Sequence, residues 1–412
     1  MRHYQDFEAH TLLGLRGKHV VTIGGGTGPF GVLSSLKHYP CSITAIVTMA
    51  DSGGSSRRLM DEFGQLPFGD LRQALVALSR NGVLWRDVFT YRFGKGVRVN
   101  GAISNGAAPN SAHSNGGATN GATPHGFTSA PGANGASNGA SNGALKVEAP
   151  TELRLGANGD LSAHQMAEQA GISGHSLGNL IISALQEINA GNLLHAIADA
   201  QELLDTAGAV LPVTLTQTTL CAEMEDGEII CGETDIDTRG NRNPESLAPI
   251  KRLYLDHPTP ACEDALRAIR RADVIVIGPG DLYTSVLPNL LVEGVAEAIR
   301  ASEAQTIYVC NLMTKHGETD GFRASSFVEE IHRYLGDRVD RVILHDGSFP
   351  AHLLDGYAVQ SQFPVEADVE QVRRLVPEVI VDQLLAVYQD HFVRHDADRL
   401  VRSIFLSPDL LS

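Results

Sequence analysis

The sequence has few basic residues, few cysteines and no long apolar run, and each shortage excludes a class of protein. Lys and Arg number 32 against 48 Asp and Glu, so the formal net charge is −16, which argues against general binding to nucleic acid or anionic membranes. No stretch approaches the roughly 18 apolar residues of a membrane-spanning helix, so we expect no membrane insertion. Residues 1–17 form a predicted tail without the apolar core of a secretory signal, which favours a cytoplasmic protein.

The cysteines are scattered, and no two of them have Cys-x-x-Cys spacing. They are Cys41, Cys221, Cys231, Cys262 and Cys310. An odd number without the spacing of metal ligands is typical of reduced thiols in the cytoplasm, and not of a disulfide framework or a zinc site. We therefore expect free thiols throughout.

Charged residues are missing from one long segment. Between Asn100 and Leu145 there is no Lys, Arg, Asp or Glu, and the tripeptide Asn-Gly-Ala recurs at irregular intervals. Such a segment buries too little apolar surface to offset its chain entropy, so residues 96–150 are predicted to be a disordered insertion, either a tolerated loop or a tether for a partner. Because the cost of closing a loop grows only logarithmically with length, residues 18–95 and 151–408 are predicted to form a single domain.

Short apolar segments alternate with helical patterns over the rest of the chain. Strands are predicted at His19–Ile23, Ile43–Met49, Asp273–Ile277, Gln305–Val309 and Arg341–Leu344, and helices at Phe30–His38, Gly69–Ser79 and Leu180–Leu185. This alternation, with continuously apolar strands, is typical of an α/β fold: a Rossmann-like, doubly wound, mostly parallel sheet with helices on both faces. Ligands of such sheets bind beyond the carboxyl ends of the strands, where the polar and glycine-rich motifs of this sequence lie.

A glycine-rich turn follows the first predicted strand. Gly24, Gly25, Gly26, Thr27 and Gly28 separate that strand from the next helix. Glycine N–H groups at a strand-to-helix turn can approach a phosphate, and the helix dipole favours its negative charge. A tight turn alone would need fewer glycines, so we predict contact with an anion or nucleotide. The turn is neither a P-loop nor a regular GxGxxG fingerprint.

Polar residues follow the second predicted strand. They are Asp51, Ser52, Gly53, Gly54, Ser55 and Ser56. A carboxylate at this place can accept hydrogen bonds from a ribose or hold Mg²⁺ against a phosphate. The alternative is a polar loop in which Asp51 caps the next helix. Asp70, at the start of a later helix, is likewise either an N-cap or a ligand contact.

Three later strand or helix ends carry further candidate ligand-binding residues. They are His175, Gly178 and Asn179 before and within an apolar helix, Gly278, Gly280, Tyr283 and Thr284 after a strand, and Asn311 after the next strand. Glycine and amide N–H groups at such positions can bind an anion. A lone histidine such as His175 is more often structural than an acid or base. No Ser-His-Asp order, metal-ligand spacing or nucleophile elbow appears, so covalent acyl chemistry has no support.

Taken together and in this order, these motifs resemble the CofD-like superfamily and are most similar to its YvcK-type branch of gluconeogenesis factors. The similarity runs from about residue 18 to 408 and includes Val393-Arg394-His395-Asp396. The resemblance implies a cytoplasmic regulator that binds a nucleotide sugar such as UDP-N-acetylglucosamine, linked to carbon metabolism, cell-wall synthesis and cell shape. It places Tyr357 and Arg394 at the nucleotide, where an aromatic ring and a guanidinium are suited to bind.

The other branch of the superfamily resembles 2-phospho-L-lactate transferase, which moves a phospholactyl group from a nucleotide donor to a deazaflavin alcohol with Mg²⁺. In that alternative Asp51 and Asp70 would bind the metal or the acceptor hydroxyl, and the reaction would depend on positioning and charge neutralisation. A dinucleotide-dependent oxidoreductase is a third hypothesis. A homodimer is typical of such proteins, and the resemblance leaves room for a regulatory protein partner.

The chain departs from the family pattern at two positions near the expected ligand. Ser52 follows Asp51 where the family often has a second acid, which removes one candidate metal ligand. Asp281 stands where Ser usually follows Gly-Pro-Gly. A carboxylate beside a phosphate-binding loop would repel an anion unless Mg²⁺ bridges the two.

Overall fold

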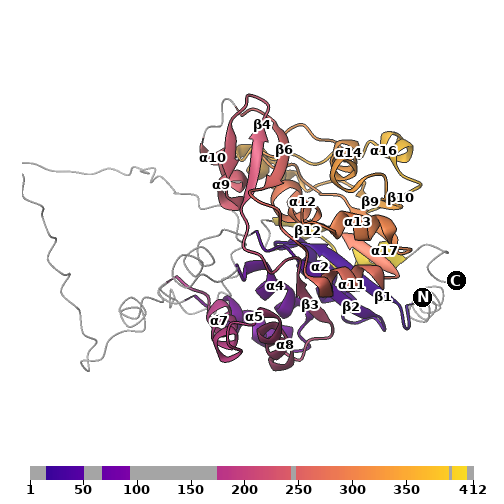
Figure 1. The fold of residues 1–412 in the computed structure, drawn as a ribbon. Coiled ribbons are helices and arrows are strands. Elements are labelled where there is room, and N and C mark those ends of the chain that lie inside the picture. Colours follow the sequence, from indigo (N-terminus) through magenta and orange to yellow (C-terminus); the bar gives the residue numbers. More distant parts are fainter. Residues whose placement is uncertain (1–14, 51–66, 93–173, 243–246, 389–391, 406–412) are drawn as a thin grey trace, which may run out of the picture.

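The computed structural model describes the chain except for residues 1–14, 51–66, 93–173, 243–246, 389–391 and 406–412 (Figure 1). The predicted insertion at 96–150, most of the predicted N-terminal tail and the whole of Asp51–Ser56 therefore lie outside the described residues.

One seven-stranded sheet forms the centre of the molecule, in the order β10-β9-β8-β7-β1-β2-β3 (Figure 1). Its strands are β1 (His19–Gly24), β2 (Ser42–Val47), β3 (Ala209–Pro212), β7 (Val274–Ile277), β8 (Gln305–Val309), β9 (Arg341–His345) and β10 (Glu378–Asp382). Every neighbouring pair is parallel. Strand β2, before the gap at 93–173, pairs with β3 after it. The parallel α/β fold predicted from the sequence is confirmed.

The direction of the crossovers reverses between β1 and β7. From β1 the chain continues to β2 on one side, whereas from β7 it continues to β8 on the other. Val20–Ile23 of β1 pairs in register with Val274–Ile277 of β7, and all these residues are buried. In open α/β sheets such a switch point is where ligands bind, beyond the carboxyl ends of the strands. Two of the glycine-rich motifs predicted from the sequence directly follow these two strands.

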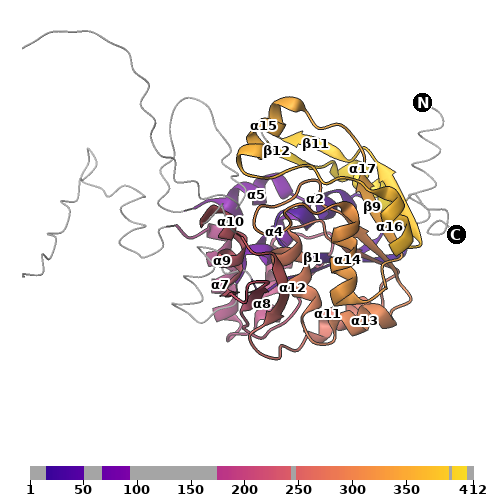
Figure 2. The same cartoon turned by 90° about the horizontal axis from the view of Figure 1, so that it is seen from above.

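Helices cover both faces of the sheet (Figure 2). One face carries α2 (Gly28–Leu36), α4 (Gly69–Leu78) and α17 (Ala397–Phe405); the other carries α11 (Glu263–Arg270), α12 (Leu287–Leu290), α13 (Val295–Ala301) and α14 (Ala324–Leu335). Helices α5 (Gly82–Thr90), α7 (Leu177–Ile188) and α8 (Leu193–Leu203) form a group beside α4, and α16 (Val369–Leu375) packs on α14. Cover on both faces explains why most buried positions of the strands are apolar.

Two small antiparallel sheets add to this core, and the sequence patterns did not predict them. One is β5-β4-β6, made of β4 (Leu220–Met224), β5 (Ile229–Cys231) and β6 (Ile250–Leu255); the other pairs β11 (Leu385–Tyr388) with β12 (Phe392–His395). Short helices connect the parts: α9 (Glu233–Asp237), α10 (Arg239–Arg242), the π-helix η1 (Leu282–Val286) and α15 (Ala351–Val359). Within the described ranges, no helix combines the length and the apolar character needed to cross a membrane.

Element ends differ from the prediction where local hydrogen bonds decide them. The helix predicted from Leu180 begins at Leu177, because Ser176 is its N-cap. The Ser176 hydroxyl accepts a hydrogen bond from the Asn179 N–H at 3.2 Å, which satisfies a donor that the first turn leaves open. Strand β2 ends at Val47, before the predicted end at Met49.

The prediction of free thiols is wrong for one pair of cysteines. Cys221 on β4 and Cys231 on β5 lie opposite each other in the antiparallel ladder, with their Cα atoms 4.1 Å apart, and form a disulfide. The pairing follows from a hairpin that the sequence patterns did not indicate. Cys41, Cys262 and Cys310 have free thiols, as predicted, and burial raises the pKa of the Cys41 thiol to about 11.

Reduction of this disulfide is expected to lower the free energy of unfolding by about 2 kcal/mol. The closed loop is short, since the two cysteines are 10 residues apart, so the constraint on the unfolded chain is at the lower end of the usual range. Urea unfolding with and without a dithiol reductant measures the difference. The variant with both Cys221→Ser and Cys231→Ser should match the reduced protein and not respond to the dithiol. Equal transition midpoints for the oxidised and reduced wild type would contradict the prediction.

Candidate functional site

At the switch point, the loop after β1 packs directly against the loop after β7. A Cβ atom added to Gly28 would lie 2.0 Å from the carbonyl oxygen of Pro279, and one added to Gly280 would lie 3.3 Å from that of Gly25. Gly26 has a positive φ of +68°, which favours glycine. At Gly28 the two loops thus approach each other more closely than a side chain would allow. Ligand contact by their backbone N–H groups stays a prediction.

Asp70 of α4 faces the first of these loops. A Cβ atom added to Gly25 would lie 2.2 Å from Oδ2 of Asp70. Helix α4 begins at Gly69 with Phe68 as its N-cap, so the alternative that Asp70 caps the helix is wrong. A small pocket joins the carboxylate to the loop; its lining is Gly24, Gly25, Gly26, Pro29, Phe30, Leu33, Val47, Asp70 and Ala74. Contact of Asp70 with a cation or a ligand hydroxyl stays a prediction.

Two further predicted residues are linked to this end of the sheet, Arg394 on the C-terminal hairpin and Tyr357 on α15. Nη1 of Arg394, on β12, donates a hydrogen bond to Oγ1 of Thr27 at 2.7 Å. The Tyr357 hydroxyl, on α15, accepts a hydrogen bond from the N–H of Val393 at 2.9 Å. Arg394 therefore contacts the glycine-rich loop directly, and Tyr357 is tied to the strand that carries Arg394.

Asn311 and His395 complete this end of the sheet. Nδ2 of Asn311 donates a hydrogen bond to the carbonyl oxygen of Gly280 at 2.8 Å, so the amide holds the second loop in place. Nε2 of His395 lies 3.1 Å from the carbonyl oxygen of Cys310. Burial lowers the pKa of His395 to about 4, against the opposing effect of that hydrogen bond. The ring is therefore neutral near pH 7 and donates its Nε2–H.

Acidification is expected to destabilise the protein through His395. Its pKa falls from 6.5 to about 4 on folding, so the unfolded chain takes up the proton first. The stability that the neutral ring contributes is full above pH 6.5 and is lost as the pH falls toward 4, by about 2 kcal/mol. The measurement is the difference in free energy of unfolding between pH 7 and pH 4.5 for wild type and for His395→Gln, whose amide can still donate to Cys310. Wild type should lose more; parallel losses in the two proteins would exclude His395 as the cause.

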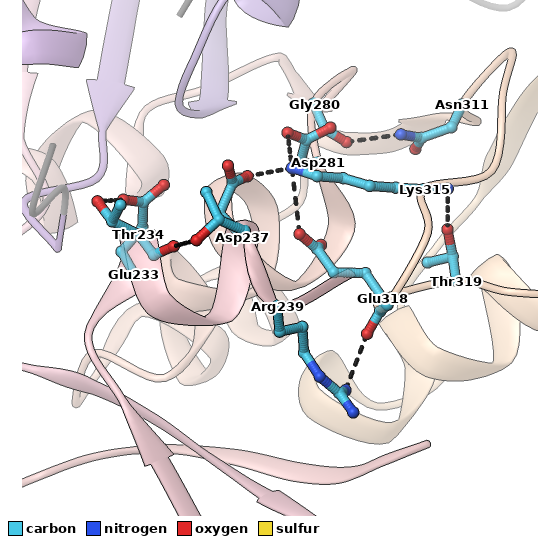
Figure 3. Close-up of polar contacts among 12 residues, drawn as sticks. Glu233, Thr234, Asp237, Arg239, Gly280, Asp281, Asn311, Lys315, Glu318 and Thr319 are labelled. Atoms are coloured by element: carbon cyan, nitrogen blue, oxygen red, sulfur yellow. Dashed lines mark hydrogen bonds and ion pairs between the residues drawn. The ribbon is translucent and has the colours of Figure 1, made fainter. Parts of the chain in front are cut away.

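A cluster of charged side chains lies beside the second loop (Figure 3). Nζ of Lys315 lies 2.7 Å from Oδ2 of Asp281 and 3.1 Å from Oε1 of Glu318, and it also contacts Oδ1 of Asp237. Burial alone would lower the pKa of Lys315, but the three carboxylates outweigh burial and raise it, so the ammonium stays charged. The Glu318 side chain is 0% exposed, and burial raises its pKa to about 8 despite Lys315.

The sequence patterns did not indicate this cluster, because its members come from three separate segments. Asp281 had been expected to repel an anionic ligand, whereas the structure pairs its carboxylate with Lys315. The sequence signal is weak: a lysine and a glutamate with i,i+3 spacing in the turn after β8.

Comparison with known proteins adds to this geometry. The model of the family described as 2-phospho-L-lactate transferase CofD matches residues 20–385. The chain belongs to the CofD family. A gluconeogenesis factor of Halalkalibacterium halodurans is 35% identical over 392 residues, which cover 95% of this chain and 96% of that protein. The gluconeogenesis factor of Bacillus subtilis is 33% identical over 386 residues, with 92% and 95% covered.

A solved structure has the same fold over almost the whole chain. The crystal structure of a member of the UPF0052 family from Bacillus halodurans superposes with a TM-score of 0.71 at 34% sequence identity, covering 94% of this chain and 99% of that one. The resemblance found from the motifs is thus confirmed: this CofD-family protein is homologous to these two gluconeogenesis factors over nearly their full length.

Not every predicted residue of this CofD-family protein lies at the glycine-rich loops. Gly178 is a packing residue, since an added Cβ would lie 2.6 Å from Cδ1 of Phe89 on α5 and 2.7 Å from Cδ of Arg72 on α4. His175 and Asn179 are each 2% exposed at the start of the same helix, α7. Ligand contact by His175 and Asn179 stays a prediction.

Tyr283 and Thr284 face the interior of the CofD-family fold. Each is only 2% exposed. The ring of Tyr283 packs edge-on against Phe322, and burial together with the Glu330 carboxylate raises its pKa. Both side chains are buried in this structure, and ligand contact by Tyr283 and Thr284, like that by His175 and Asn179, stays a prediction. Ser285, which was not predicted, lies closer to the loops: its Oγ would be 3.1 Å from a Cβ added to Gly26.

Proposed function

We propose that this CofD-family protein is a gluconeogenesis factor that binds a nucleotide sugar of the UDP-N-acetylglucosamine class and thereby regulates carbon metabolism, cell-wall synthesis and cell shape. The observation that carries the proposal is the hydrogen bond from Arg394 to Thr27. It joins a guanidinium to the glycine-rich loop at the switch point, where ligands of parallel sheets bind.

In this proposal each part of the ligand has a chemical counterpart. The diphosphate meets the N–H groups of the loop Gly25–Gly28 and the guanidinium of Arg394. The base stacks on Tyr357, whose hydroxyl is bonded to Val393 and thereby keeps the ring next to Arg394. The net charge of −16 elsewhere on the chain makes a local cation important for holding a dianionic ligand.

Calorimetric titration tests the proposal. The purified full-length protein is titrated with UDP-N-acetylglucosamine, with and without Mg²⁺, beside GTP, GDP and NAD as competitors from other classes. Micromolar binding of the UDP-sugar, with the ligand recovered intact, is the expected result. No heat with the UDP-sugar, but Mg²⁺-dependent binding of a guanine nucleotide, would overturn it; binding of NAD alone would support the oxidoreductase hypothesis.

A phospholactyl transferase of the CofD type is the second candidate, and the position of Asp70 favours it. A carboxylate beside a phosphate-binding loop can hold Mg²⁺ against a transferring group. This candidate requires Mg²⁺-dependent product from a deazaflavin alcohol and a nucleotide donor, and its loss in Asp70→Asn. Absence of product with the wild-type protein would leave the regulator.

A further inference from the structure

The side chain of Asp281 pairs with a lysine from another turn. Asp281 comes directly after Gly280 and precedes η1, and its carbonyl oxygen accepts hydrogen bonds from the N–H groups of Ser285 and Val286. An aspartate at such a position commonly bonds the N–H groups of the following turn through its side chain. No such side-chain bond is present at Asp281, and its carboxylate instead reaches Nζ of Lys315 at 2.7 Å (Figure 3).

Lys315 is itself fixed by contacts with residues other than Asp281. An ammonium has three N–H donors, and Nζ of Lys315 contacts three carboxylates, those of Asp237, Asp281 and Glu318. The Lys315 backbone N–H donates to Oγ1 of Thr319 at 2.8 Å, and the side chain is 17% exposed. Nζ donates hydrogen bonds to Asp237 and Asp281 and lies at ion-pair distance from Glu318, so side chains of the protein already engage the ammonium, unlike the phosphate-binding lysine of a P-loop.

The pair changes the charge that an anion meets at the loop. The Asp281 side chain is 43% exposed, so an unpaired carboxylate there would present its charge to any phosphate on Gly278–Gly280. Glu318, at 0% exposure, is buried behind the pair and does not contribute exposed charge. Lys315 gives the Asp281 carboxylate a cationic partner at 2.7 Å, which offsets part of its charge, since the same ammonium also pairs with Asp237 and Glu318.

We propose that Lys315 is a positioning residue that fixes the Asp281 carboxylate and offsets its charge, so that the Gly278–Gly280 loop, which packs against Gly25–Gly28, tolerates the diphosphate of a nucleotide bound at that first loop. The inference rests on the proposed function, in which this end of the sheet binds a UDP-sugar. It also makes Mg²⁺ unnecessary for balancing Asp281, because the protein supplies the cation itself.

A set of charge-matched variants tests this role. Binding of UDP-N-acetylglucosamine is measured by calorimetry in EDTA for wild type, Lys315→Met, Asp281→Asn and the double variant. Lys315→Met leaves Asp281 unpaired and should bind at least 10-fold more weakly, whereas Asp281→Asn should stay within 3-fold of wild type, on the order expected for one close charge. The double variant should recover to within 3-fold of wild type. Its recovery is the decisive result, since Asp237 and Glu318 lose Lys315 in both variants and only the charge at Asp281 differs between them.

Two controls distinguish an effect of charge on affinity from an effect of misfolding. Uridine carries no phosphate, so wild type and Lys315→Met should bind it equally, and the loss for the UDP-sugar should shrink as salt is added. Wild-type affinity in Lys315→Met, or a double variant as weak as Lys315→Met, would overturn the inference. If Lys315→Met does not fold, the folded double variant decides: binding near wild type supports the inference, and loss of binding overturns it.

Failure of the proposed function has a different signature. A wild-type protein that does not bind the UDP-sugar overturns that function, and the same series is then titrated with inorganic pyrophosphate. Weakening by Lys315→Met and recovery in the double variant would still support the charge pair. No difference among the variants, or no binding by any of them, would overturn it as well.

Discussion

Replacing Arg394 with Ala is expected to weaken binding of UDP-N-acetylglucosamine by roughly 100-fold, close to 3 kcal/mol, and to leave the fold intact. The guanidinium is partly buried and donates to Thr27 in the loop after β1, so it is fixed before the ligand arrives. A charged donor that is already in place loses little side-chain entropy on binding, and its hydrogen bonds to phosphate are charge-assisted.

Matched variants show whether the effect belongs to this position. Arg373→Ala removes an exposed guanidinium of α16 that pairs with Glu370, and it should bind as wild type does. Tyr357→Ala should also lose most of the affinity, whereas Tyr357→Phe keeps the ring and loses only the bond to Val393, so its loss should be smaller. Unchanged affinity in both Arg394→Ala and Tyr357→Ala, with unchanged melting temperatures, would rule out a nucleotide at this end of the sheet.

The centre of the fold could be predicted because its signals are local. Strands β1 and β7 are apolar at their buried positions except Thr22, and each is followed at once by glycines, so the sequence places both loops at strand ends. A parallel sheet then requires these ends to lie on one edge. That β1 and β7 are neighbours, and therefore that the two loops touch, depends on strand order, which no local pattern contains.

The remaining site residues depend on contacts between distant segments. Arg394 was named from the family resemblance, and only the hairpin of β11 and β12 explains why it reaches Thr27. The ion pair of Lys315 and Asp281 joins two different turns. From the sequence alone, Asp281 was expected to carry an unpaired charge that repels an anion. The burial of Tyr283 could not be predicted for a related reason: a hydroxyl near a glycine loop does not indicate which side of the following helical turn it occupies.

The largest effect on stability is expected at Glu378. The Arg341 side chain is 0% exposed; its Nε donates to Oε2 of Glu378 at 2.8 Å, its Nη2 lies 2.7 Å from the same oxygen, and its Nη1 donates to the carbonyl oxygen of Ile404 at 2.8 Å. Arg341 and Glu378 are register partners in β9 and β10, so their ion pair links β9 to the edge strand β10. The bond to Ile404 links Arg341 to helix α17 as well. Glu378→Ala leaves a buried cation without its carboxylate and should lower the free energy of unfolding by about 3 kcal/mol or more.

Urea unfolding measures this loss, with Glu370→Ala as the control, because Glu370 pairs with Arg373 at an exposed site and should change stability by less than about 0.5 kcal/mol. A double variant identifies the physical cause. If the cost comes from an unpaired buried charge, adding Arg341→Met to Glu378→Ala should recover much of the stability, since a neutral side chain of similar length needs no partner. Additive losses would mean instead that the two side chains act through packing, and the edge of the sheet would then depend on shape and not on charge.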